Sequence, residues 1–147
     1  GISIYALGKS QLKKIRAAMA SGIFQLTLAC LVIADVVYRL MVGSKPQSIL
    51  IMGIGAIALV ANICCLWLIS QHRQGEIHLR ASWIFSRNDV IANLGVILAG
   101  LLVNLFSSRF PDLIIGIAIT LLVFLGGLEI IRDAYRERVK LRRGMQL

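Results

Sequence analysis

Four long apolar stretches, at about residues 17–41, 49–70, 79–106 and 112–131, limit the possible folds of this chain more than any other feature. A helix needs roughly 20 apolar residues to cross the hydrocarbon layer of a bilayer, and each stretch is long enough. Hydrophobic residues make up 58% of the 147 residues and charged residues only 16%, against about 25% in an ordinary soluble domain. The links are too short to supply an amphipathic outer layer, so the pattern excludes a water-soluble globule.

The predicted fold is therefore all-α, a multi-pass transmembrane helical bundle. We expect residues 1–132 to form the transmembrane domain, with four complete spans and, at residues 1–8, the end of a fifth helix whose start precedes this sequence. Residues 133–147 are expected to form a basic cytoplasmic tail. The formal net charge of +9 reflects Lys and Arg that follow or separate the apolar runs, so it indicates membrane topology rather than nucleic-acid binding.

Cysteines and histidines offer weak signals. Cys30, Cys64 and Cys65 lie inside apolar stretches and are expected to be small buried hydrophobes, not a disulfide framework. His72 and His78 flank a polar connector with Glu76, but their spacing matches no closed metal site, so we expect ordinary loop histidines. Because the chain also lacks a P-loop, a dinucleotide fingerprint and the common hydrolase motifs, the sequence predicts neither an enzyme nor an organic cofactor.

Most acidic residues have a simple structural interpretation. Asp112 lies where a span begins, and its carboxylate interacts favourably with the positive N-terminal end of the helix dipole. Asp35 precedes Arg39 by four residues, which is the spacing of an ion pair along one helix face. Two further acids near the end of the last span are expected to pair with neighbouring arginines of the same helix: Glu129 and Asp133 with Arg132 and Arg136.

Asp89 differs, because it lies about ten residues into the third span and has no basic residue three or four positions away. An ionisable group at such a depth costs at least about 2.5–3.5 kcal/mol on insertion scales, so it is expected to face protein, water or substrate. Helical projection places other oxygen-bearing or small residues on the same stripe: Ser82, Ser86, Asn93, Gly100 and Asn104. Oxygen ligands suit a divalent cation or a proton relay, but residues of these types also stabilise the packing of transmembrane helices. Both interpretations, an ion or proton site and a packing stripe, stay open.

The order of features from Ala61 onward resembles the cation diffusion facilitator family of metal/proton antiporters, in particular a compact bacterial branch. The residues that carry this resemblance are Asn62 in a span, the His-Arg connector, Leu-Arg-Ala-Ser-Trp at 79–83, Ser-Arg-Asn-Asp at 86–89, Gly-Val-Ile at 95–97 and Phe-Pro-Asp-Leu-Ile at 110–114. The resemblance implies a six-helix membrane domain in the bacterial plasma (inner) membrane. The excess of Lys and Arg in the connectors and after the last span assigns these segments and the C-terminus to the cytoplasm. The resemblance also implies a homodimer and a divalent cation, zinc above all, as substrate.

In that family the transport site combines ligands on the second helix with an H-x-x-x-D pair on the fifth. The resemblance places the aspartate of this pair at Asp89 and the histidine at Phe85, which cannot bind a metal. It therefore implies a site built from Asp89 with Asn93, Asn88 and Ser86 as candidate oxygen ligands. Such a site would bind zinc less tightly than one with an imidazole.

Two functions follow from these observations. The first is proton-coupled efflux of a zinc-like divalent cation, in which Asp89 binds metal and proton in turn. The second is a non-transporting membrane scaffold or partner subunit with a degenerate metal site, which the phenylalanine at position 85 favours.

Overall fold

The computed structural model describes residues 10–42, 48–70 and 76–144, and this part of the chain is helical apart from short links and ends. Its helices are α2 (Gln11–Val42), α3 (Ser48–Ser70), α4 (Ile77–Phe106) and α5 (Phe110–Gly144). All four are long and apolar enough to cross a membrane, which confirms the all-α multi-pass fold. The predicted fifth helix end at residues 1–8 lies outside the described residues.

The helices run longer than the apolar stretches that predict them. A helix satisfies its backbone hydrogen bonds internally, which lipid demands, so helical structure continues until a local signal stops it. Between α4 and α5 that signal is Ser107, which ends α4 in a left-handed conformation (φ 48°, ψ 34°). Pro111 then falls in the first turn of α5, where its missing N–H is not needed. At about 1.5 Å per residue, the 35 residues of α5 extend for about 50 Å, well beyond a hydrocarbon layer of roughly 30 Å.

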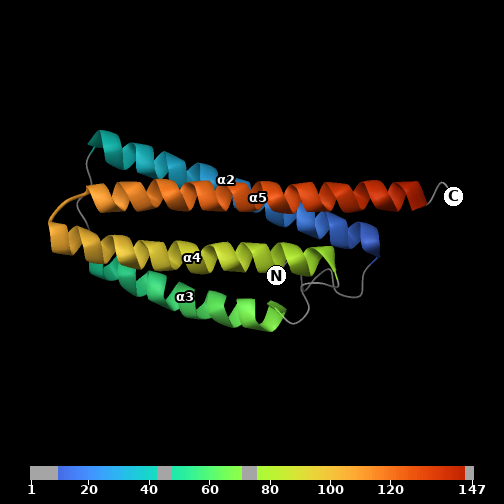
Figure 1. The fold of residues 1–147 in the computed structure, drawn as a ribbon, viewed down its shortest axis with the longest axis horizontal. Coiled ribbons are helices and arrows are strands. Elements are labelled where there is room, and N and C mark those ends of the chain that lie inside the picture. The colour runs from blue at the N-terminus through green and yellow to red at the C-terminus, as the bar shows by residue number, and fades with distance from the viewer. Residues whose placement is uncertain (1–9, 43–47, 71–75, 145–147) are drawn as a thin grey trace.

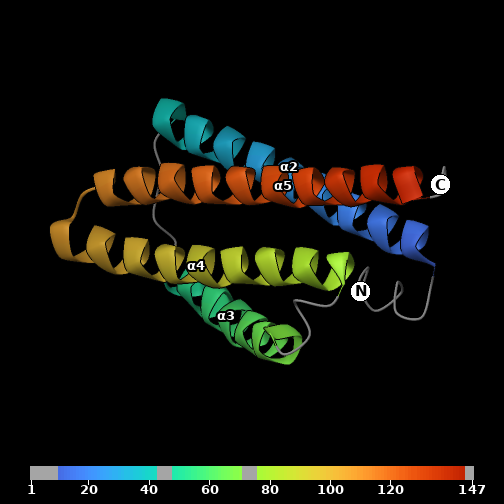
Figure 2. The same ribbon diagram turned by 45° about the vertical axis from the view of Figure 1, so that its right-hand side comes forward.

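Two antiparallel helix pairs make up the bundle, α2 with α5 and α3 with α4 (Figure 1). The α4 helix joins the pairs, because it contacts α5 and α2 as well as α3, whereas α2 and α3 make no contact within the described residues. The turned view shows the same arrangement, with α2 crossing α5 obliquely and α3 on the far side of α4 (Figure 2). The α4 helix is thus the only described helix that contacts all the others.

A small core holds α2, α4 and α5 together near the start of α2, and its members are Ile15, Ala18, Ala81, Ile84, Ile130 and Ala134. Many large apolar side chains on the outer surface are exposed instead, Trp67 and Leu105 among them. Lipid solvates such side chains, so this surface is expected for a membrane bundle. The same reasoning corrects one prediction: Cys30, Cys64 and Cys65 are exposed on the chain, not buried, because an apolar thiol gains nothing by leaving lipid for a helix interface.

Candidate functional site

Asp89 lies near the middle of α4, and its side chain is half-buried. Its carboxylate forms no ion pair or hydrogen bond with any residue that the structure describes. The carboxylate oxygens are not fully buried, so part of their surface stays accessible on the described chain. The carboxylate is therefore only partly covered by neighbouring side chains, and no cation of the described residues neutralises it.

Contacts on either side of Asp89 show which way it faces. Four residues along an α-helix advance the direction of a side chain by about 40°, so residues 85, 89, 93 and 97 turn gradually around α4. Phe85 points to α2, where its ring stacks on Phe24 with centroids 6.1 Å apart. Ile97 points to α3, since a Cβ added to Gly55 would lie 3.9 Å from Ile97 Cγ1. Asp89 and Asn93 therefore lie on the α4 face between α2 and α3.

We call this face, with Ser86, Asp89 and Asn93, the site face. Ser86 is buried and Asn93 is half-buried. Asn93 also lines a cavity of about 240 Å³ between α2, α4 and α5. Of the other residues predicted on the stripe, Ser82 and Gly100 are half-buried, whereas Asn104 is exposed near the end of the helix.

The remaining candidate ligand, Asn88, lies away from the site face. Its side chain is completely buried, and its amide packs against Gly126 of α5. Gln25 of α2 lies against the same glycine. In the sequence Gln25 is a polar interruption of the apolar run at 17–41. Its one further signal is the short polar or small series Ser21, Gln25 and Ala29, which are all buried.

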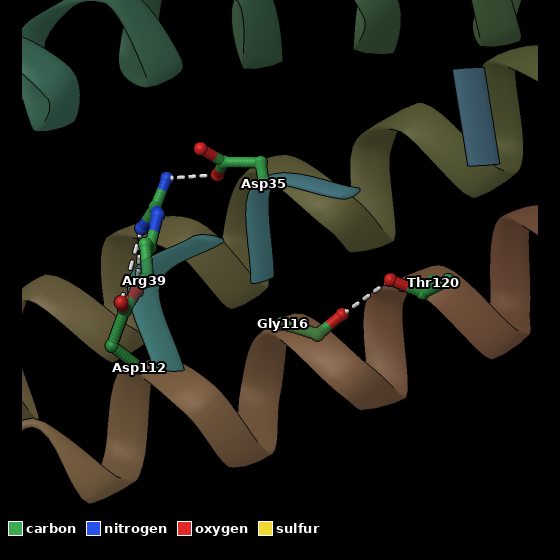
Figure 3. A network of polar contacts seen from close by, with 5 residues as sticks. All are labelled: Asp35, Arg39, Asp112, Gly116 and Thr120. Atoms are coloured by element: carbon green, nitrogen blue, oxygen red, sulfur yellow. Dashed lines mark hydrogen bonds and ion pairs between the residues drawn. The ribbon is translucent and has the colours of Figure 1, made fainter. Parts of the chain in front are cut away.

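Charged residues at one end of the bundle join α2 to α5, as Figure 3 shows. Arg39 contacts Asp35 at 2.5 Å, which confirms the predicted ion pair. The same guanidinium also donates to both carboxylate oxygens of Asp112 on α5, at 3.2 and 3.0 Å. Nearby, Thr120 donates to the carbonyl oxygen of Gly116 at 2.8 Å. All of Arg39, Asp35 and Asp112 border the 240 Å³ cavity that reaches Asn93.

Ion pairs at the opposite end differ from the prediction. Arg80 of α4 contacts Asp133 at 3.0 Å, and both Arg80 and Arg87 come within 4.0 Å of Glu129. The acids thus pair across α4 and α5, and the expected partners within α5, Arg132 and Arg136, are exposed. The antiparallel packing of α4 on α5 places the α4 arginines opposite the acids, a contact that spacing along one helix cannot reveal.

His78 also departs from its prediction. It occupies the first turn of α4 and is 1% exposed, with its Nδ1 3.3 Å from Glu76 Oε2, so it is not a loop histidine. Glu76 contacts Lys14 of α2 at 2.5 Å, and this hydrogen bond lowers the pKa of Glu76 below its usual value of 4.5. His72 lies outside the described residues. Among the residues that are described, no group of three or more His, Cys, Asp or Glu could hold a metal ion, so Asp89 is an isolated acid on its face.

Comparisons of the sequence with known proteins identify the family of this chain. Residues 4–137 match the model of the cation efflux transmembrane domain. The chain is 22% identical over 123 residues to the cadmium, cobalt and zinc/H(+)-K(+) antiporter of Bacillus subtilis, covering 82% of this chain and 40% of that protein. It is 23% identical over 122 residues to the zinc transporter ZitB of Escherichia coli, covering 82% of this chain and 39% of that one. The ZitB of Shigella flexneri matches to the same extent.

The chain therefore spans about 40% of the length of these relatives. The family model nevertheless covers far more than half of the chain, and it includes all four described helices up to residue 137 of α5. This chain is a multi-pass membrane protein that belongs to the cation diffusion facilitator family and matches its transmembrane cation efflux domain.

Proposed function

We infer that this chain is the membrane part of a zinc exporter that exchanges a divalent cation for protons, with Asp89 as the principal ligand. The observation that carries this proposal is the unpaired, accessible carboxylate in the middle of α4. A membrane protein retains such a costly group where it serves an ion or proton path. Ser86 and Asn93 supply further oxygen ligands on the same face.

Competition between metal and proton explains how one carboxylate couples two fluxes. A divalent cation binds the deprotonated carboxylate, so metal binding releases a proton and protonation releases the metal. If Asp89 meets the two sides of the membrane in turn, each cycle moves a cation one way and protons the other.

One carboxylate with neutral oxygens is too few ligands for tight zinc binding, since zinc sites use three or four strong ligands. In the proposed transporter, the second helix of the six-helix domain supplies the remaining ligands at the site face. The absence of contact between α2 and α3 in the described residues is compatible with a further helix there.

Topology and assembly belong to the same proposal. The exposed basic residues of α5 beyond residue 131 and those at the start of α2 lie at one end of the bundle. Cytoplasmic segments of membrane proteins collect Lys and Arg, so this end and the C-terminus are assigned to the cytoplasm of a bacterial plasma membrane. The assembly proposed by resemblance to the family is a homodimer.

A phenylalanine at position 85, where the family has a histidine, favours the second candidate. This candidate is a non-transporting subunit whose metal site has lost a ligand. The ring of Phe85 stacks on Phe24 and fills the family's histidine position with an apolar contact between α4 and α2. A scaffold of this kind would fold and insert normally but would move no metal under any gradient.

Flux measurements under an imposed pH gradient distinguish the two candidates. The intact protein in proteoliposomes with an acidic lumen is expected to take up zinc several-fold faster than in vesicles without a gradient. Addition of a protonophore with a potassium ionophore should remove the difference. Equal zinc uptake with and without the gradient would contradict proton coupling, and no uptake above empty vesicles would favour the scaffold.

A further inference from the structure

Two buried amide side chains meet a glycine where α2, α4 and α5 come together. Gln25 of α2 is 2% exposed and Asn88 of α4 is 0% exposed. A Cβ added to Gly126 of α5 would lie 2.7 Å from Gln25 Nε2 and would collide with Asn88 Nδ2. Both amides therefore pack on the bare backbone of one residue, and any larger side chain at position 126 would displace them.

Each amide side chain makes one hydrogen bond through one of its polar groups and leaves the other group without a partner. Gln25 Nε2 donates to the carbonyl oxygen of Val123 at 3.2 Å, and Asn88 Oδ1 accepts from Arg87 at 3.4 Å. The remaining groups, Gln25 Oε1 and Asn88 Nδ2, are buried and have no hydrogen-bond partner among the described residues. One is an acceptor and the other a donor, and an unpaired amide group is costly away from water. A hydrogen bond between these two groups, which the structure does not show, would satisfy both at once.

We propose that the Gln25–Asn88 amide pair, seated on Gly126, positions Asp89 by fixing the rotation of α4. Consecutive residues of an α-helix differ in direction by about 100°, so an Asn88 held toward α5 and α2 turns Asp89 to the site face. Rotating α4 enough to redirect Asp89 would pull the Asn88 amide out of its contacts. The proposal rests on the proposed function, because it assumes that Asp89 binds the transported cation.

Positioning and simple helix packing predict different kinetics. If the amides only held the bundle together, their loss would lower the amount of folded protein and leave the zinc affinity of the surviving molecules unchanged. If they orient Asp89, their loss weakens metal binding in folded protein. Loss of groups that orient a metal ligand typically costs about 10- to 100-fold in affinity.

The test measures zinc uptake by the intact protein in proteoliposomes, normalised to folded protein, for Asn88→Ala, Gln25→Ala and their double variant. We expect each single variant to raise the half-saturating zinc concentration about tenfold, with a smaller change in maximal rate. Because the two side chains act as one pair, the double variant should be hardly worse than either single variant. Gly126→Ala, which displaces both amides, should act in the same direction.

Two matched controls are available. Thr27→Ala removes a polar side chain from an exposed position on α2, and Gly53→Ala adds a Cβ that meets no described atom within 4 Å. Both controls should keep the half-saturation of the unaltered protein. An unchanged half-saturation in Asn88→Ala, or effects of the two alanine variants that add in full, would overturn the positioning proposal.

The variant Asp89→Asn shows whether a negative result contradicts only the role of the amide pair or also the proposed transport function. If Asp89→Asn abolishes zinc uptake while Asn88→Ala behaves like the unaltered protein, the amide pair has no positioning role and the transport proposal stands. If Asp89→Asn transports normally, Asp89 is not the ligand, and both proposals fail together.

Discussion

Replacing Asp89 by asparagine will reduce zinc uptake by the intact protein by about a hundredfold or more. The two side chains are nearly equal in size, so helix packing is preserved while the negative charge is lost. An amide cannot release a proton to make room for a cation, and it is a much weaker ligand than a carboxylate. The loss should appear in the initial rates of zinc uptake by proteoliposomes with an acidic lumen.

Asp35→Asn provides the matched control, because it makes the same chemical change on α2. Asp35 already pairs with Arg39, and that guanidinium retains Asp112 when Asp35 is altered. Exposed pairs of this kind contribute about 1 kcal/mol or less, so folding and flux should be close to normal. If both variants lose flux equally, the effect comes from general loss of acidic charge and not from a ligand at position 89.

Replacing Phe85 by histidine should lower the half-saturating zinc concentration by about tenfold, equivalent to about 1.4 kcal/mol of binding. Residues four apart on a helix are neighbours, so an imidazole at position 85 can reach a metal held by Asp89. It would supply the nitrogen ligand that zinc favours and that the described site lacks. The variant loses the stacking of Phe85 on Phe24, which is expected to cost about 1 kcal/mol of stability.

Phe85→Leu removes the same ring without adding a ligand and is the control for that loss. We expect it to match the half-saturation of the unaltered protein, with a slightly lower thermal stability. The measurement is the zinc dependence of uptake for all three proteins at one pH. A histidine variant no different from the leucine variant would show that position 85 does not reach the metal bound at Asp89.

The fold was predictable because its determinants are local. Each apolar run is long enough to cross a bilayer, and a helix is the simplest way to satisfy its backbone there. The pairing of Asp35 with Arg39 followed from spacing along one helix and is present in the structure. The sequence also shows that no basic residue lies three or four positions from Asp89 on its own helix, and in the structure Asp89 forms no ion pair with any described residue.

Contacts between helices were not predictable, because the spacing of residues along one helix does not show which helix packs against it. The acids Glu129 and Asp133 pair with Arg80 and Arg87 across α4 and α5, not within their own helix. Arg39 reaches Asp112 only because α2 and α5 run antiparallel. The burial of Gln25 against Gly126 likewise depends on which faces of α2 and α5 meet.

Proton release on zinc binding tests most directly whether Asp89 exchanges a proton for the metal. Calorimetric titration of the purified intact protein, repeated in buffers of different ionisation enthalpy, gives the number of protons released for each zinc bound. We expect zinc binding to release protons, and we expect Asp89→Asn to lose most of both the binding and the release. Zinc binding by Asp89→Asn with unchanged affinity and unchanged proton release would contradict this exchange.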